Sequence, residues 1–269
     1  LTLYDEASNL RCRISTHGMA FLGLIAVLGM VLLAGHTQTA FISLAGLSVY
    51  GVGPALWRAL RAREWQPVTR RAVLVVIAAA IGITLAGIQF VPTWELVRHS
   101  VRAQGLPFNE RVSFSLSPLY VGRALLPRFG DPVPPNHIEH VAYIGITGLA
   151  LVASELVVAV KHRRDDGPAG SELPRSDSLA CLLLTFAGLF FALGFYNPLY
   201  LLLARYAPGF AHFRVPARWL ALTVVGMAAF AGRALQGVWD GRRLRERTVL
   251  IIVLSSAILI LWAVGGLRW

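Results

Sequence analysis

The sequence has few charged residues for its length. Only 14% of its 269 residues are Asp, Glu, Lys or Arg, while 56% are hydrophobic. A soluble domain usually contains about 25% charged residues. The charges that are present group into short arginine-rich segments between long uncharged runs. This distribution disfavours an ordinary soluble domain and is typical of membrane spans joined by loops.

Cysteines and recognisable cofactor motifs are also scarce. Cys12 and Cys181 lie far apart in the sequence, which indicates neither a disulfide framework nor a cysteine-ligated metal. The segment His137-Ile138-Glu139-His140 does not have the spacing of a helical zinc signature. We therefore expect no metal and no other cofactor; a divalent metal remains open but has no support in the sequence.

Nucleotide-binding glycine loops, nucleophile elbows and haem or iron–sulfur spacings are absent from the sequence. Their absence disfavours an ATP-driven transporter and a soluble-type hydrolase. Lysine is almost absent as well, because Lys161 is the only lysine among 25 basic residues. The net charge is +11, but the arginines flank apolar runs and form no single basic face. We expect membrane lipids as partners and no nucleic acid.

Long apolar runs are what the sequence has in abundance. We predict seven membrane spans, at residues 18–34, 39–56, 72–91, 141–160, 178–195, 216–238 and 249–267. At 1.5 Å per residue, each covers most of a hydrocarbon core about 30 Å thick. Pro92 is expected to interrupt the third helix. The predicted fold class is therefore all-α, a polytopic transmembrane helix bundle in one domain, residues 1–269, with interfacial helices in its outer loops.

The arginine distribution predicts an orientation for these spans. Basic residues gather before the first span, between the second and third, after the fourth, and between the sixth and seventh. The positive-inside rule places these segments in the cytoplasm, together with the N-terminus. Because the chain begins at Leu1 and shows no signal peptide, we also expect it to be a fragment of a longer protein.

Two loops would then face outward, at residues 96–140 and 196–215. In the second loop, Asn197 and Pro198 predict a helix start, followed by a short interfacial or re-entrant helix up to Tyr206. The outer loops and their margins are rich in arginine: Arg98, Arg102, Arg111, Arg123, Arg128, Arg205, Arg214 and Arg218. Arginine binds phosphate through two parallel donors, which favours an anionic, lipid-linked ligand. The alternative is that long loops cross the membrane regardless of charge.

Several polar residues near the predicted outer side are candidates for a site. His36 and Gln38 lie in a very tight turn, where they would either line an outer cavity or cap a helical hairpin. Glu95, at the end of the third span, is a candidate general base or sugar ligand, or else an interfacial charge. Glu139 immediately precedes the fourth span and is a second weak candidate for the catalytic carboxylate or for lining a cavity.

Two charged residues lie well inside predicted spans, away from the span ends: Glu155 in the fourth and Arg233 in the sixth. Charges within a membrane are costly and are usually paired. We predict that these two residues form a structural ion pair. The competing interpretation is that the Arg233 side chain extends towards the membrane surface.

Five segments, in this order, carry recognisable motifs: Gly35-His36-Thr37-Gln38; Gln89-Phe90-Val91-Pro92-Thr93-Trp94-Glu95 with Ser100-Val101-Arg102; Ser115-Leu116-Ser117-Pro118 with Leu126-Pro127; Glu139-His140-Val141-Ala142-Tyr143-Ile144-Gly145; and Gly194 through Asn197-Pro198-Leu199-Tyr200 to Pro208-Gly209 and Phe213-Arg214-Val215-Pro216-Ala217-Arg218. They resemble motifs of the YfhO family of bacterial membrane proteins. The resemblance extends over most of the chain, from Leu33 to Arg233.

This resemblance implies a fold related to the GT-C class of integral-membrane glycosyltransferases. Such an enzyme takes a sugar from a polyprenyl-phosphate donor and transfers it to a cell-envelope acceptor at the outer face of the bacterial cytoplasmic membrane. Arg98, Arg102, Arg214 and Arg218 would be candidates for holding the donor phosphate, with His36 and Gln38 lining the cavity. The family's usual acidic residue, in a first outer loop, has no counterpart in the sequence. The alternative is a non-enzymatic lipid or polymer transporter or a membrane assembly subunit.

Overall fold

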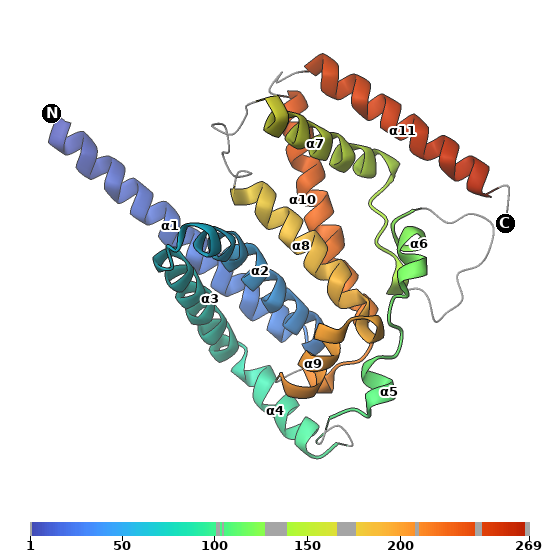
Figure 1. Ribbon diagram of the computed structural model, residues 1–269. Coiled ribbons are helices and arrows are strands. Elements are labelled where there is room, and N and C mark those ends of the chain that lie inside the picture. Colours follow the sequence, from blue (N-terminus) through green and yellow to red (C-terminus); the bar gives the residue numbers. More distant parts are fainter. Residues whose placement is uncertain are drawn as a thin grey trace. The chain divides into compact units, whose positions relative to one another are not determined.

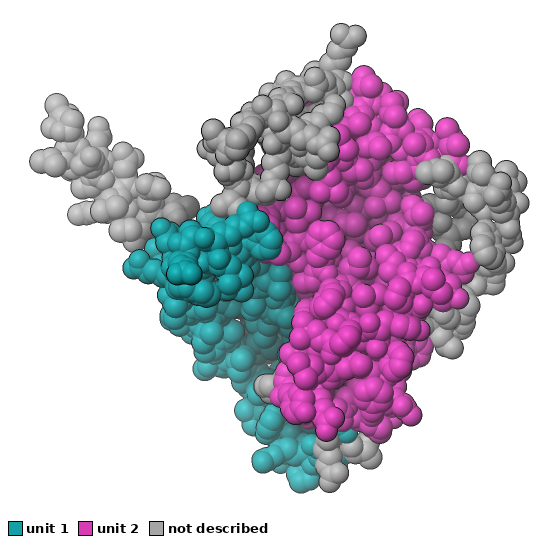
Figure 2. Space-filling view, in the orientation of Figure 1, with its two compact units in different colours: residues 1–105 teal, residues 106–269 magenta. Residues whose placement is uncertain are grey.

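The computed structural model describes residues 2–100, 103, 105–126, 139–165, 176–207, 210–239 and 244–266. Throughout these ranges the chain forms helices, turns and loops without any strand, which confirms the all-α prediction for them. The chain divides into two compact units, Leu1–Gly105 and Leu106–Trp269, shown in Figure 2. Each unit is described by itself below.

Unit 1 contains the helices α1 (Thr2–Leu33), α2 (Thr37–Ala62), α3 (Gln66–Leu85) and α4 (Gly87–Arg98), as labelled in Figure 1. Helices α1 and α2 both pack against α3. Ile25 and Leu28 of α1 and Ala78 of α3 are buried where these helices meet. Phe21, Leu24, Leu44 and Leu47 pack around them. Unit 1 is thus held largely by apolar side chains.

Unit 2 alternates long helices with short helical segments. Its elements are α5 (Phe108–Arg111), η1 (Pro118–Tyr120), α6 (Val121–Leu125), α7 (Ile146–Asp165), α8 (Ser176–Ala192), η4 (Gly194–Tyr196), α9 (Pro198–Tyr206), η5 (Phe210–His212), η6 (Pro216–Trp219), α10 (Leu220–Trp239) and α11 (Leu244–Gly266), where η marks a 3₁₀ helix. Helix α10 packs against α7 and α8, and α11 packs against α7 (Figure 1). Helix α10 is therefore the central helix of this unit.

Glycines allow α8 and α10 to approach very closely. A Cβ atom on Gly188 of α8 would lie 2.5 Å from the Thr223 nitrogen and 2.7 Å from the Trp219 oxygen. A Cβ atom on Gly226 of α10 would lie 2.4 Å from Thr185 Oγ1. Backbone therefore meets backbone at this contact, as small residues permit in membrane helix pairs. The Thr223 hydroxyl donates a hydrogen bond to the Thr185 carbonyl at 3.2 Å, across the same contact.

Within the described residues, three helical stretches are long and apolar enough to cross a membrane: Thr37–Ala62, Gln66–Leu85 and Pro216–Trp239. The other four predicted spans coincide with shorter apolar stretches among the described residues: Gly18–Leu33, Ile146–Val157, Asp177–Ala192 and Val249–Ile260. Helix length and composition therefore indicate a membrane protein. The count of seven spans, their orientation and the cytoplasmic position of the N-terminus remain predictions.

The third predicted span was wrong in the position of its interruption. The helix breaks at Ala86, whose N–H bonds to the Gly82 carbonyl at 3.0 Å, and not at Pro92. Pro92 lies inside α4, which begins at Gly87. Proline there removes the hydrogen bond that would have reached the Ile88 carbonyl, and so short a helix tolerates the loss of one bond. Glycine after Ala86 is a weak helix former and favours the break there.

The boundaries of the fourth and fifth predicted spans were also displaced. Helix α7 begins at Ile146 and not at Val141, because Gly145 has a left-handed φ of 87° and the Ala142 N–H bonds to the Ala124 carbonyl. Helix α8 ends at Ala192, before Phe195, because Gly194 has a φ of 46°. Glycine adopts such angles without steric cost, so both glycines direct the chain out of the helix.

The short helix predicted after Asn197 is confirmed as α9, Pro198–Tyr206. The Asn197 Oδ1 atom accepts hydrogen bonds from the N–H groups of Leu199 at 3.0 Å and Tyr200 at 3.3 Å. This is the N-cap geometry that Asn followed by Pro favours. The other predicted outer loop, 96–140, contains the short segments α5, η1 and α6 within its described part.

Candidate functional site

Glu139 and Arg218 form a two-pronged ion pair at the start of η6 and α10. The Arg218 Nε and Nη2 atoms donate to Glu139 Oε2 and Oε1, each at 2.7 Å. The Arg218 side chain is 32% exposed and that of Glu139 is 35% exposed, so solvent reaches both. This parallel arrangement is the strong, directional form of an arginine–carboxylate contact. We call it the Arg218–Glu139 fork.

Two hydrogen bonds hold the backbone in place just after Glu139. His140 is buried, and its Nε2 atom lies 3.0 Å from the Phe114 carbonyl. Since a carbonyl only accepts, Nε2 carries the proton. Two residues beyond, the Ala142 N–H donates to the Ala124 carbonyl at 2.7 Å. The position of Glu139 therefore does not depend on the fork alone.

A strained turn places Arg218. Val215 has φ 63° and ψ 72° and is buried. A left-handed conformation is unfavourable for a β-branched residue, and such strain is found where the surrounding structure determines the backbone. After this turn Pro216, Ala217 and Trp219 are buried, while Arg218 remains partly exposed. The strained residue Val215 thus precedes a buried segment in which the Arg218 side chain is partly exposed.

Ser115, Gly194 and Pro216 meet beside this turn, although they are far apart in the sequence. The Ser115 hydroxyl donates to the Val112 carbonyl at 2.6 Å and accepts from the Phe195 N–H at 2.8 Å. A Cβ atom on Gly194 would lie 2.3 Å from the Ser115 Oγ atom and 2.6 Å from Pro216 Cβ. Glycine is therefore required at position 194 both for its positive φ and for space.

Aromatic side chains pack around Trp219, the residue after Arg218. The Trp219 ring centroid lies 4.8 Å from that of Phe191 and 5.8 Å from that of Phe210, on which it stacks. Tyr200 of α9 meets Phe210 edge-on at 5.7 Å. Aromatic pairs at these separations add stability beyond the burial of area. The cluster joins α8, α9, η5 and η6 next to the fork.

Arg111 has a structural role that sequence reasoning did not recognise. Its Nε atom donates to the Leu106 carbonyl and its Nη1 atom donates to the Ala204 carbonyl at 3.0 Å. The Tyr200 hydroxyl lies 3.5 Å from the Arg111 carbonyl, and burial raises the pKa of Tyr200 to about 12. Arg111 therefore connects the segment around α5 to α9 through backbone carbonyls. This role differs from the phosphate contact that was predicted for the outer arginines as a set.

The predicted site residues are divided between the two units. Unit 2 contains Glu139, Arg214 and Arg218; Arg214 is exposed next to the strained turn. Unit 1 contains His36, Gln38, Glu95 and Arg98, and Glu95 and Arg98 are exposed in the last turns of α4. Arg102 lies outside the described residues. Among the described residues of this set, the structure thus brings Glu139 and Arg218 together.

His36 is the N-cap of α2. Its Nδ1 atom accepts from the Thr39 N–H at 3.1 Å and lies 2.7 Å from the Thr39 hydroxyl. This is the arrangement of the capped helical hairpin, the alternative to a cavity-lining role. Gln38 is buried in the first turn of the same helix. At the adjoining turn, a Cβ atom on Gly35 would lie 3.7 Å from Gln89 Nε2, so two of the motif segments lie side by side within unit 1.

The structure gives Arg233 an acidic neighbour other than Glu155. The Arg233 Nη1 atom lies 3.6 Å from Asp177 Oδ2, and the Asp177 side chain is 64% exposed. The pair of Glu155 with Arg233 remains a prediction. For metals, the described residues contain no group of three or more His, Cys, Asp or Glu side chains that could hold an ion. His137, part of the motif considered for zinc, lies outside them.

Sequence reasoning assigned no role to Ser115 or Gly194, although both belong to the recognised motifs. The signal that could have found them is the pairing of a loop serine with a glycine shortly before Asn197-Pro198. This pairing identifies a contact only when the structure shows that the segments containing Ser115, Gly194 and Pro216 meet. Comparisons of the chain with protein-family models, with curated proteins and with solved structures found no match.

Proposed function

We propose that unit 2 forms the donor-binding part of a membrane glycosyltransferase of the GT-C type, related to the YfhO family. The observation that supports this proposal most directly is that motif segments far apart in the sequence meet in the structure. Three of the five motif segments, those beginning at Ser115, Glu139 and Gly194, meet around the Arg218–Glu139 fork. They are separated by up to about a hundred residues in the sequence, so local folding alone does not account for their meeting.

The proposed donor is a sugar linked to a polyprenyl phosphate. Arg218 and the neighbouring exposed Arg214 supply the positive charge that a phosphate requires. In the reaction, a hydroxyl oxygen of the cell-envelope acceptor forms a bond to the anomeric carbon. The bond from that carbon to the phosphate oxygen breaks, and its electron pair leaves with the phosphate. The hydroxyl proton passes to a carboxylate, for which Glu139 is the candidate within this unit.

The apolar surroundings suit such a donor. Pro216–Trp239, which follows directly from Arg214, is one of the three stretches able to cross a membrane. A polyprenyl chain would lie in the hydrocarbon region while its phosphate stays near the end of this helix. With the orientation predicted from the arginines, that end faces outward, in the bacterial cytoplasmic membrane.

Binding of a short polyprenyl phosphate tests the proposal. The protein would be reconstituted into lipid nanodiscs, and its affinity for farnesyl phosphate measured. We expect Arg214→Ala and Arg218→Ala each to weaken binding at least tenfold, because each removes a charge-assisted contact worth about 1.5–3 kcal/mol.

Arg205→Ala is the matched control for this experiment. Arg205 is an exposed arginine of the same unit, and its guanidinium lies 5.6 Å from the Tyr206 ring centroid. This variant should bind farnesyl phosphate like the unaltered protein. Equal weakening in all three variants would indicate general surface attraction, and unchanged binding in Arg214→Ala and Arg218→Ala would overturn the proposal.

The fork itself favours a second candidate function, a non-enzymatic membrane assembly subunit. Glu139 and Arg218 neutralise each other, as a purely structural pair would. In that case Arg218→Ala would lower the melting temperature without altering farnesyl phosphate binding. The two functions therefore give opposite results in the same pair of measurements.

A further inference from the structure

We propose that Glu139 is an internal competitor that occupies the anion site of Arg218 until a phosphate displaces it. This inference rests on the proposed function, because it specifies how the same arginine would receive a phosphate. Its ligand class is a phosphate monoester or diester carried on a lipid. The consequence is that binding of the donor and release of the Glu139 carboxylate are one event.

The geometry of the fork supports the competition. The Glu139 oxygens sit 2.7 Å from Nε and 2.7 Å from Nη2, on one edge of the guanidinium. Two oxygens of a phosphate bind that same edge in the same parallel manner. One edge cannot hold the carboxylate and the phosphate together. A phosphate that binds there must therefore take the place of the carboxylate.

Exposure makes the exchange feasible. Both side chains of the fork are about one-third exposed, at 32% for Arg218 and 35% for Glu139. A fully buried pair would leave an uncompensated charge when broken, at a cost of several kcal/mol. A partly solvated carboxylate is rehydrated when it leaves. The fork can therefore open without the penalty that attaches to a buried pair.

The frame around the fork does not depend on it. Glu139 is followed by the His140–Phe114 hydrogen bond at 3.0 Å and the Ala142–Ala124 bond at 2.7 Å. Arg218 follows the buried residues Pro216 and Ala217, and its own N–H bonds to the Val215 carbonyl at 3.1 Å. Only the two side chains need to move for the exchange.

Charge gives the exchange its direction. Arg214 is exposed four residues before Arg218 and adds positive charge to this segment, which attracts a phosphodiester with one negative charge or a monoester with up to two. The Glu139 carboxylate carries one negative charge, and it repels a phosphate that approaches Arg218. Removing that negative charge should therefore strengthen phosphate binding.

The decisive variant is Glu139→Gln, with farnesyl phosphate affinity measured on the protein in nanodiscs. We expect affinity to rise about tenfold, since glutamine is neutral and offers one acceptor to a fork that needs two. If Glu139 instead positions Arg218 for the ligand, the same variant binds more weakly. Lower or unchanged affinity in Glu139→Gln would overturn the competition.

Two further variants keep the test independent of folding and of the proposed function. Glu139→Asp retains the charge but is one methylene shorter, so it should raise the affinity by less than Glu139→Gln does. In the double variant Glu139→Gln/Arg218→Ala the gain should vanish, because it acts through Arg218; a gain that persists would overturn the competition. Farnesol, which has no phosphate, should show no gain in any variant.

The outcomes separate the two proposals. If Arg218→Ala binds farnesyl phosphate normally, the anion site itself is absent and both proposals fail. If Arg218→Ala weakens binding and Glu139→Gln does not strengthen it, the site stands and the competition fails. Melting temperatures of all variants would be measured alongside. If Glu139→Gln does not fold, Glu139→Asp takes its place.

Discussion

The two units show two different ways of packing helices. In unit 1, a Cβ atom on Gly29 of α1 would lie 3.7 Å from Leu85 Cβ, which is an ordinary van der Waals distance. In unit 2, a Cβ atom on Gly226 of α10 would lie 2.4 Å from Thr185 Oγ1. At Gly82 of α3 a Cβ atom would lie 3.1 Å from Leu28 Cβ, a tighter contact but still longer than the one at Gly226. Of these three contacts, the closest therefore lies between α8 and α10 of unit 2.

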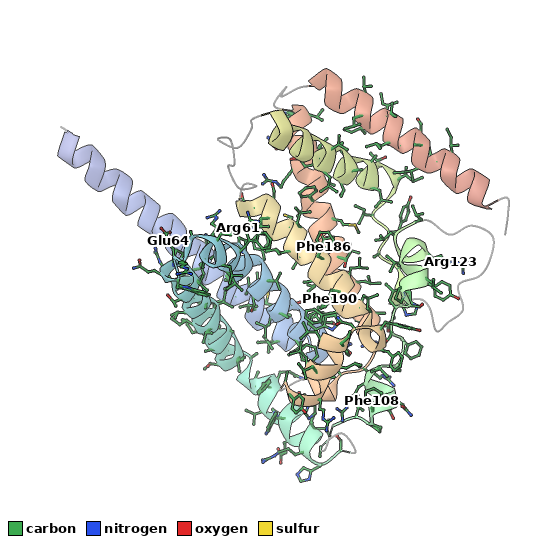
Figure 3. All side chains as sticks on the ribbon, in the orientation of Figure 1. Arg61, Glu64, Phe108, Arg123, Phe186 and Phe190 are labelled. Carbon is green, nitrogen blue, oxygen red and sulfur yellow. The ribbon has the colours of Figure 1, made fainter. Side chains whose placement is uncertain are left out.

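The two units also differ in how much of their apolar helices is buried. Only 11% of the apolar stretch in Gln66–Leu85 is buried, compared with 39% in Pro216–Trp239. Unit 2 still presents apolar side chains, such as Phe186 and Phe190 on α8, which are 65% and 44% exposed (Figure 3). Exposed apolar area of this kind marks a surface that meets lipid or another protein. Unit 2, which contains the closest of these helix contacts, also contains the Arg218–Glu139 fork.

The largest expected effect comes from filling the close helix contact. Gly226→Ala should destabilise the protein by about 3 kcal/mol, because the added methyl group would overlap Thr185 and the Cys181 carbonyl. The matched control is Gly29→Ala in unit 1, which should be neutral or slightly stabilising, since alanine is the better helix former. Unfolding in detergent micelles measures both; equal effects of the two substitutions would contradict the proposed difference between the units.

A smaller effect is expected from the two helix caps. Asn197 is buried, its Nδ2 atom donates to the Phe190 carbonyl at 2.7 Å, and its Oδ1 atom caps α9. Asn197→Ala should cost about 2 kcal/mol, since it leaves buried polar groups without partners. The cap of α2, His36, is exposed, so His36→Ala should cost about 0.5 kcal/mol. The same unfolding assay ranks them, and the reverse order would show that unit 1 is the more tightly determined.

The smallest effect depends on pH and is specific to unit 2. Burial raises the pKa of Tyr200 to about 12, above its ordinary value of 10. Between these values the unfolded chain loses the proton while the folded protein keeps it, so stability falls as pH rises from about 10 to 12. Tyr200→Phe should match the unaltered protein near pH 7 and be more stable by about 1 kcal/mol at pH 11. Parallel losses of stability in both proteins at pH 11 would contradict this assignment.

Sequence patterns predicted the elements better than their ends. In the described part of the chain, the apolar runs located α1, α2, α3, α7, α8, α10 and α11, and Asn197 followed by Pro198 located the start of α9. A contact between distant residues, the Ala142–Ala124 hydrogen bond, precedes the displaced start of α7, and glycines with positive φ lie beside the displaced ends of α7 and α8. Pro92 was a misleading signal because a single proline removes one hydrogen bond, whereas the break at Ala86 reflects the local turn.

The sequence by itself determined that the chain is helical and apolar, and which residues carry charge near the helix ends. It did so because these properties follow from local periodicity and composition. Only the tertiary structure decided that Glu139 and Arg218 share a fork, that Arg111 binds backbone carbonyls, and that Gly194 meets Ser115 and Pro216. Such contacts join residues about 20 to 95 positions apart. They depend on how the helices pack, which no local pattern encodes.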